Sequence, residues 1–83
     1  MNQQILSENT TLTSLKLGQS GTIQYTADSE LCVALLNLGI KNGTNFTIAN
    51  QSPLGDLLAI AANGTKIAIR TKDATQIIVK ILE

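Results

Sequence analysis

The chain of 83 residues contains no histidine and no tryptophan, and it has one residue each of cysteine, proline, tyrosine and phenylalanine. A single cysteine cannot form an internal disulfide. Because the chain has no histidine, this cysteine also has no second soft ligand with which to bind a metal and no histidine base to activate it as a nucleophile. Because Cys32 lies in an apolar run, we interpret it as a small buried hydrophobic residue. The sequence therefore predicts no metal site and no cofactor.

Paired carboxylates are a second possible basis for catalysis. Asp28 with Glu30, and Asp56 with Asp73, are the acidic pairs that could act together. Neither pair has the sequence context of an acid–base dyad, which needs two acids with different pKa values in one cleft. We predict that the chain has no catalytic residue and is not an enzyme.

Charge and hydropathy exclude two further classes of partner. Six basic and six acidic side chains cancel to a net charge of zero. Binding to nucleic acid needs several Lys or Arg that neutralise phosphates together, so no nucleic-acid partner is expected. No apolar run approaches the roughly 18 residues of a membrane span, and the first residues lack the pattern of a secretory signal. We expect a cytoplasmic protein without direct membrane insertion.

The length and the scarcity of aromatic residues define the expected core. Eighty-three residues suffice for one domain, and with only 2% aromatic residues the core must be built from Leu, Ile, Val and Ala. Residues 1–10 show no periodicity and are predicted to be a loose N-terminal leader before a single domain at 11–83. Leu12 and Leu15 are spaced as in one helical turn that faces the core. Gly18 and Gly21 are expected to bracket a tight turn.

Alternating apolar residues predict five short strands. The first covers Thr22–Thr26, in which Ile23 and Tyr25 are two positions apart. The other four contain Phe46 and Ile48; Leu58, Ile60 and Ala62; Ile67 and Ile69; and Ile77, Val79 and Ile81.

Turn chemistry separates these elements. Asn63-Gly64 is typical of a two-residue type I′ hairpin, in which both central residues need a positive φ. Thr71–Thr75 suits a single capped helical turn. The residues predicted to form structural turns are Gly39, Gly43, Gly55, Asn63 and Gly64.

One helix is predicted after the first strand, capped by Asp28 or Ser29 and terminated by Gly39. Its core stripe is expected to contain Leu31, Ala34, Leu35 and Leu38. Adding Cys32, Val33 and Leu36 widens the apolar arc to roughly 260°, against about 100° for an ordinary surface helix. Either the domain covers this helix on more than one side, or Val33 and Leu36 are available to another protein chain.

The predicted fold is mostly β: a small five-stranded SH3-like barrel with one inserted α-helix after the first strand. Such a barrel hides its strand edges by near-closure. An OB-fold is the structural alternative. Its usual oligonucleotide-binding face needs aromatic and basic residues that this chain lacks.

Four ordered motifs resemble the FeoA family and together cover nearly everything after residue 10. They are Leu12-x-x-Leu15-x-x-Gly18-x-x-Gly21-x-Ile23, Leu35-x-x-Leu38-Gly39-Ile40-x-x-Gly43, Pro53-Leu54-Gly55-Asp56, and Ile67-Ala68-Ile69-Arg70 followed by Asp73-Ala74-x-x-Ile77-x-Val79. The resemblance implies a small SH3-like cytosolic protein of bacterial ferrous iron uptake that acts on the cytosolic GTPase part of the membrane transporter FeoB. It also implies a relation to the modules that end some iron-dependent repressors.

The sequence departs from the family pattern at two places. Val33-Ala34 stand where FeoA-like chains often carry a basic pair, and Asn42 stands where they often carry proline. The first difference favours docking by burial of apolar surface more than by ion pairs. The second is mild, because Asn42-Gly43 can form the same turn.

The segment Pro53-Leu54-Gly55-Asp56 has two interpretations. It is a rigid loop in which Asp56 bonds nearby backbone amides, or it is a stiff support for Leu54 as the anchor of a partner. The residues predicted to bind a partner are Val33, Leu36, Pro53, Leu54 and Asp56.

Two functions remain open at this point. The first is an accessory or adaptor protein of ferrous iron uptake that binds the cytosolic part of a FeoB-like transporter through a largely apolar surface. The alternative is a self-associating SH3-like regulatory module, similar to the C-terminal domain of iron-dependent repressors, with a homo-oligomer formed through the apolar helix.

Overall fold

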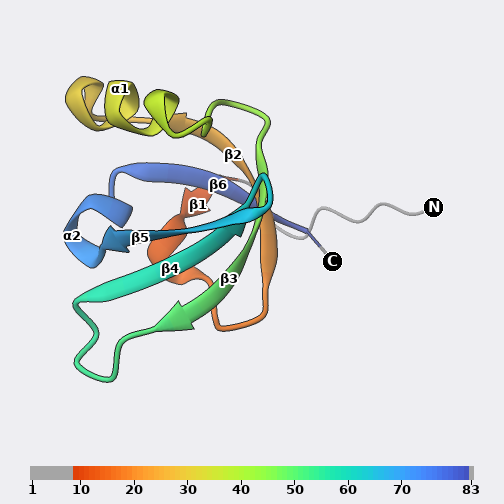
Figure 1. The fold of residues 1–83 in the computed structure, drawn as a ribbon, viewed down its shortest axis with the longest axis vertical. Helices are drawn as coiled ribbons and strands as arrows, with labels where there is room; N and C mark the ends of the chain where they lie inside the picture. The colour runs from red at the N-terminus through yellow and green to blue at the C-terminus, as the bar shows by residue number, and fades with distance from the viewer. Residues whose placement is uncertain (1–8, 83) are drawn as a thin grey trace.

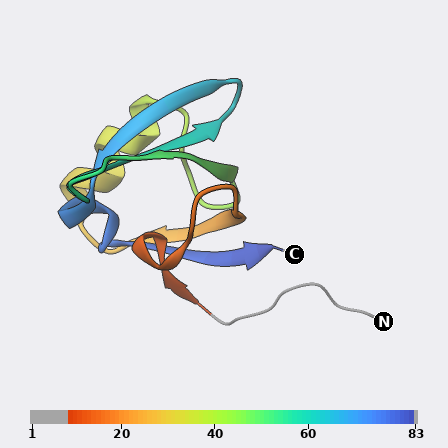
Figure 2. The same ribbon diagram turned by 90° about the horizontal axis from the view of Figure 1, so that it is seen from below.

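The computed structural model describes residues 9–82, which form one antiparallel sheet of six strands that curls into a barrel (Figures 1 and 2). The strand order is β1-β6-β2-β3-β4-β5. The strands are β1 (Thr10–Thr11), β2 (Ser20–Thr26), β3 (Asn45–Gln51), β4 (Leu57–Ala62), β5 (Thr65–Arg70) and β6 (Ile77–Leu82). The helices are the 3-10 turn η1 (Leu12–Ser14), α1 (Ser29–Asn37) and α2 (Thr71–Ala74).

The predicted mostly β barrel is confirmed, with one more strand than expected. Strand β1 has only two residues and pairs with β6, Thr10 lying opposite Val79. Two residues are too few to produce an alternating pattern, so this strand could not be predicted from periodicity. Helix α1 consequently follows the second strand. The leader predicted for residues 1–10 lies outside the described residues, apart from Asn9 and Thr10.

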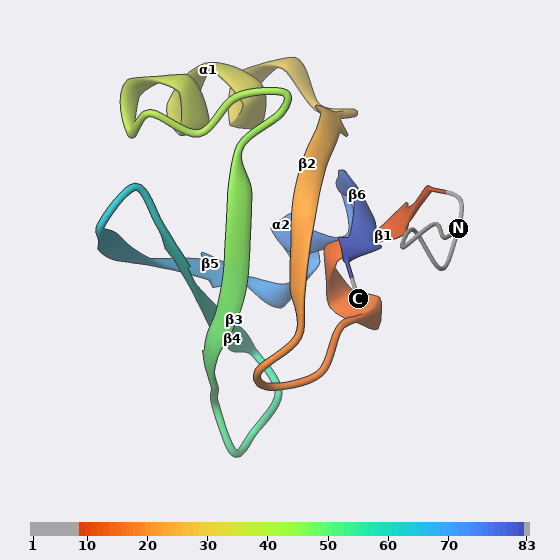
Figure 3. The same cartoon turned by 90° about the vertical axis from the view of Figure 1, so that its right-hand side faces the viewer.

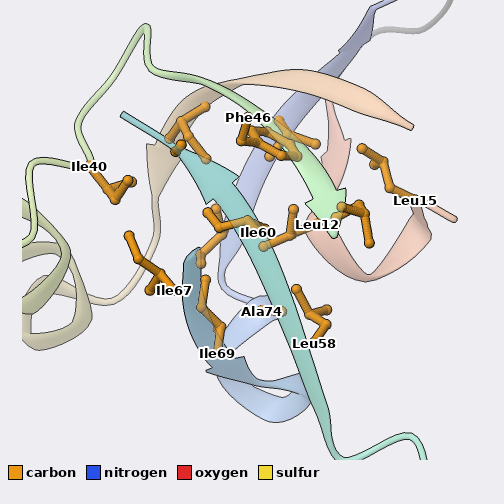
Figure 4. Close-up of a cluster of buried hydrophobic side chains, with 14 of the residues drawn as sticks. Leu12, Leu15, Ile40, Phe46, Leu58, Ile60, Ile67, Ile69 and Ala74 are labelled. Atoms are coloured by element: carbon orange, nitrogen blue, oxygen red, sulfur yellow. The ribbon is translucent and has the colours of Figure 1, made fainter. Parts of the chain in front are cut away.

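The core contains the inward-facing residues of every strand except β1, together with residues from all three helical segments (Figure 4). Leu12 and Leu15 are both buried, as their spacing predicted. Aliphatic side chains supply almost the whole cluster, and Phe46 is its only aromatic member. The buried residues are Leu12, Leu15, Ile23, Leu35, Ile40, Phe46, Ile48, Leu58, Ile60, Ala62, Ile67, Ile69, Ala74, Ile77 and Val79.

The hairpin between β4 and β5 forms as predicted. Asn63 has φ 55° and Gly64 has φ 78°, so both central residues of the turn adopt the left-handed region. Ala62 and Thr65 pair directly across the turn. Asparagine and glycine adopt this region at least cost, which explains why the dipeptide fixes the register of the two strands.

The prediction that Gly21 ends a tight turn is wrong. Gly21 is buried within β2, where it lies opposite Phe46 of β3 and Ile81 of β6. A Cβ atom at this position would lie 2.6 Å from the carbonyl oxygen of Lys80 and 2.9 Å from Cζ of Phe46. Glycine is required here because two neighbouring strands leave no room for a side chain.

The alternation in β2 is interrupted after Ile23. A shift in the pairing of β2 with β6 falls between Ile23 and Tyr25. As a result Ile23 is buried while Tyr25 is 48% exposed. A bulge of this kind turns the following side chain away from the face that the period-two pattern would give it.

Candidate functional site

Helix α1 begins at a side-chain cap and is anchored by two leucines. The carboxylate of Asp28 accepts a hydrogen bond of 3.0 Å from the backbone N–H of Glu30, which satisfies one of the free amides at the helix start. Leu35 is buried and Leu31 packs against the core cluster. The helix therefore lies across one end of the barrel with a fixed face inward (Figure 1).

The C-terminus of α1 is closed by a Schellman motif. Gly39 has φ 84°, its N–H donates to the carbonyl of Leu36, and the N–H of Ile40 donates to the carbonyl of Leu35, both at 2.9 Å. Ile40 then returns to the core beside Leu35. The terminator role predicted for Gly39 is confirmed.

A second contact fixes this end of the helix from outside. The side-chain amide of Asn63, in the β4–β5 turn, donates a hydrogen bond of 2.9 Å to the carbonyl oxygen of Gly39. Asp28 caps the start of α1 locally, whereas this bond ties the end of α1 to the β4–β5 turn.

Three large apolar side chains of this region face solvent, and we call them the helix surface: Val33, Leu36 and Leu38. Their exposed fractions are 58%, 50% and 53%. The barrel thus does not cover the predicted partner-binding residues Val33 and Leu36. Beside them lies a cavity of about 280 Å³, lined by Thr26, Cys32, Leu36, Ile40, Lys41 and Asn42.

Two details of the predicted helix are wrong. Ala34 and Leu38, expected on the core stripe, are exposed, because the core receives α1 only along Leu31 and Leu35 and the helix ends before Leu38. Cys32 is half-buried at the rim of the cavity rather than enclosed. The sequence fixes which residues are apolar, but the angle at which the helix docks decides which of them are covered.

The loop between β3 and β4 presents a second apolar residue. Leu54 is 89% exposed. It occupies a turn in which the N–H of Gly55 donates to the carbonyl of Ser52 at 2.9 Å, with Pro53 at the position where its fixed φ suits a turn. We call Pro53, Leu54 and Asp56 the loop surface.

Hydrogen bonds stiffen this loop, some within the loop itself and others from Thr71, the first residue of α2. The hydroxyl of Ser52 accepts from the N–H of Leu54 at 3.2 Å and donates to Oδ1 of Asp56 at 2.7 Å. Thr71 donates its backbone N–H to the carbonyl of Asp56 at 2.9 Å and its hydroxyl to the carbonyl of Gly55 at 2.6 Å. The expectation that the Asp56 side chain bonds backbone amides is wrong, because its partner is the serine hydroxyl.

The remaining turn glycines, Gly43 and Gly55, have φ 91° and φ 79°.

The helix surface and the loop surface lie at opposite ends of the molecule. Figures 1 and 3 both show α1 at one end of the long axis and the β3–β4 loop at the other, and that axis measures 37 Å. The five residues predicted as one partner-binding set are therefore split between two separate surfaces. The sequence could not reveal this separation. Helix α1 precedes β3 and the β3–β4 loop follows it, so the two surfaces lie beyond opposite ends of the same strand.

Other exposed apolar side chains escaped the sequence analysis. Leu17, Tyr25 and Leu57 are 61%, 48% and 42% exposed. Leu57 could have been found, since it lies out of phase with the alternating residues that begin at Leu58. Leu17 gives no such signal.

Among residues 9–82, the charged side chains form one ion pair and no metal-binding group. Within residues 9–82, no three histidine, cysteine, aspartate or glutamate side chains gather where they could hold one metal ion. Arg70 and Asp73 approach to 3.8 Å, with the arginine side chain 69% exposed, so this pair is a solvated contact. In the described part of the chain, no helix has the length and apolar character needed to cross a membrane.

Comparison with known proteins decides the family. The model of the FeoA domain matches residues 10–81. The chain is a member of the FeoA family. No curated protein sequence matches it significantly. Membership associates the chain with ferrous iron transport.

Solved structures confirm the SH3-like fold of this FeoA domain. It matches the FeoA protein from Chlorobium tepidum with a TM-score of 0.84 and 28% identity, over 89% of this chain and 71% of that one. FeoA from Stenotrophomonas maltophilia, a procaryotic SH3 domain protein solved with zinc, matches with a TM-score of 0.71 and 24% identity, over 84% of this chain and 88% of that one.

The same fold occurs inside larger regulators. A manganese-dependent transcriptional repressor in complex with manganese matches with a TM-score of 0.81 and 18% identity. The match covers 93% of this chain and 38% of the repressor. At this identity the likeness concerns the fold alone.

Proposed function

We propose that this FeoA-family chain is an accessory protein of ferrous iron uptake that binds the cytosolic part of a FeoB-like transporter through its helix surface, from the cytoplasm. The observation that supports this proposal most directly is the exposure of Val33 and Leu36 on α1 and of Leu38 just beyond its end. A rigid apolar surface loses little conformational entropy when it binds. Clusters of exposed apolar side chains on a small protein are typical of binding sites.

The residues around the helix surface favour an apolar mode of docking. Val33 and Ala34 occupy positions where related chains often have a basic pair, so ion pairs cannot be formed there. The neighbouring cavity of about 280 Å³ could admit one apolar side chain of the partner. The loop surface, at the far end, is a second candidate contact for the same partner.

Co-purification with the solubilised transporter tests this proposal. Leu36→Asp should abolish recovery of the transporter while leaving the circular dichroism spectrum unchanged, because Leu36 is half exposed and lies outside the core. Leu17→Asp is the control, a leucine outside α1 that is 61% exposed. Leu54→Asp reports separately on the loop surface. Normal recovery with both Leu36→Asp and Leu54→Asp would remove both surfaces from consideration.

The exposure of Val33 and Leu36 on α1 also suits a second candidate, a self-associating regulatory module. Its predicted route is contact between copies through α1. Light scattering across a range of protein concentrations tests whether the chain forms a homo-oligomer at all.

A further inference from the structure

The outer face of β4 and β5 is lined by small side chains with cations beyond them. Cross-strand pairs place Ala59 opposite Ala68 and Ala61 opposite Lys66. The inward residues between them are buried, so these side chains face outward. Arg70 continues the same face of β5. We call Ala59, Ala61, Lys66, Ala68 and Arg70 the sheet face; β4 and β5 lie side by side in front of β6 in Figure 1.

This face can receive an apolar side chain. A hollow of about 290 Å³ opens on it, with Leu57, Ala59 and Ala68 among its lining residues. Methyl groups at Ala59 and Ala68 let another element approach closely, whereas longer side chains would hold it away. Asn50, Gln51 and Ser52 also line the hollow, which contains no charged residue.

The charge of the chain is neutral in total but uneven along its length. Half of the six basic residues fall within seven positions, at Lys66, Arg70 and Lys72. With Asp73 as the one acid, residues 66–73 have a net charge of +2. Residues 17–40, which include α1, contain two acids and no basic residue, a net charge of −2.

Helix α1 presents acid and apolar groups on one outward stripe. Glu30, Val33 and Leu36 follow one another at a spacing of three, so their side chains lie on neighbouring positions of the helix surface. All three are exposed. Asp28 is also exposed, directly before the first turn. The stripe is therefore acidic at the helix start and apolar beyond it.

We propose that α1 of one copy docks on the sheet face of a second copy. Val33 and Leu36 pack over Ala59 and Ala68, and the acidic start of the helix faces the cations of β5. The two elements have matching lengths: nine helical residues span about 13 Å, and the four steps from Lys66 to Arg70 also span about 13 Å.

Reciprocal exchange of this contact closes a dimer. The helix and the sheet face are different surfaces of one chain, so the dimer closes where both contacts form at once about a two-fold axis. One short helix buries little area, whereas two exchanged helices double it toward the roughly 1,200–2,000 Å² of a stable interface. Lys66 and Arg70 lie on either side of Ala68 along β5, so a cation is available to the acidic helix start in either direction.

This inference shares Val33 and Leu36 with the proposed function and depends on the same exposed helix. Self-association and transporter binding would then compete for α1, and the dimer would be the form in which the helix surface is covered. The sheet face belongs to the dimer alone. Variants of the sheet face therefore separate the two proposals.

Sedimentation and light scattering of the full chain at low and high salt test the dimer by charge reversal. Wild type should dimerise, and added salt should weaken the dimer. Lys66→Glu with Arg70→Glu, or Glu30→Lys alone, should raise the dimer dissociation constant at least tenfold. The three changes combined should restore it to within about threefold of wild type. Lys16→Glu, an exposed lysine elsewhere, is the control and should have no effect.

The outcomes are distinct. A wild-type chain that stays monomeric, a dimer indifferent to both reversals, or a triple variant that fails to recover would each overturn the inference. Transporter recovery by Lys66→Glu with Arg70→Glu should equal or exceed that of wild type. If the reversals dissociate the dimer but Leu36→Asp still recovers the transporter, the proposed function fails while the dimer stands.

Discussion

The side-chain amide of Asn63 lies 2.9 Å from the carbonyl oxygen of Gly39, so the tip of one hairpin holds the end of the exposed helix. These residues are 24 positions apart. Asn63 therefore has two structural roles. Its backbone adopts φ 55° in the turn, and its side chain binds the residue that ends α1.

Substitutions at Asn63 can separate these tasks. Asn63→Gly keeps the turn conformation but removes the hydrogen bond, and should cost about 1 kcal/mol of unfolding free energy. Asn63→Ala also imposes the left-handed conformation on alanine and should cost about 1–2 kcal/mol more. Urea denaturation measures both. Equal stability of the two variants would contradict the assignment of a separate conformational role.

Amide hydrogen exchange gives the local consequence. With Asn63→Gly, exchange at Gly39 and Ile40 should accelerate relative to the core of β4, because the helix terminus loses its outside support. A uniform change over the whole chain would show instead that the bond acts only on global stability.

Gly39 and Gly18 form a matched pair for a second prediction. Their φ values are 84° and 87°. Alanine in this left-handed conformation should lower the unfolding free energy by about 1–2 kcal/mol at either position. A Cβ at Gly39 also meets Nδ2 of Asn63 at 3.3 Å, whereas one at Gly18 meets nothing within 4 Å. Gly39→Ala should therefore be the less stable variant.

Thermal denaturation can resolve the difference, because 1 kcal/mol shifts the midpoint by about 4–8 °C in a domain of this size. Gly39→Asn should lie between wild type and Gly39→Ala, since asparagine tolerates the left-handed region better. If Gly39→Ala and Gly18→Ala melt together, the contact with Asn63 contributes nothing.

Local chemistry accounts for the parts of this fold that the sequence predicts. The Asn63-Gly64 turn and the end of α1 at Gly39 both depend on the sign of φ at one or two residues. Alternating burial in β4 and β5 likewise follows from neighbours in the chain. Such features can be predicted without knowing which distant residues pack against them.

Features that depend on distant residues were missed. Gly21 is glycine because of Phe46 and Lys80, which approach it from other strands. The exposure of Ala34 and Leu38 depends on where α1 meets the barrel. The separation of Leu36 from Leu54 follows from the barrel topology, so the candidate site was predicted as a set of residues but not as two surfaces.

Ser52 supplies a third prediction, on the stiffness of the loop surface. Its hydroxyl both accepts from the N–H of Leu54 and donates to Asp56. Ser52→Ala should accelerate amide exchange at Leu54 and change global stability by no more than about 1 kcal/mol. Exchange at Ile60, in the core, is the internal reference. Unaltered exchange at Leu54 would mean that Pro53 and the turn bond from Gly55 suffice to hold the loop.

Gly21 is the position where the smallest addition should do the greatest damage. Its φ is not in the left-handed region, so alanine suffers no backbone strain of that kind, and only space is at issue. The nearest atom, 2.6 Å from the added Cβ, is the backbone oxygen of Lys80, which cannot swing aside as a side chain can. We expect Gly21→Ala to lose about 3 kcal/mol or more, the upper end for overpacking.

A double variant locates the source of this loss. Phe46→Leu removes the aromatic atoms near the added Cβ but leaves the Lys80 carbonyl in place, so it should not rescue Gly21→Ala. Urea denaturation of the single and double variants gives the coupling between the two positions. Full recovery in the double variant would show that the phenylalanine ring, and not the β6 backbone, requires glycine at this position.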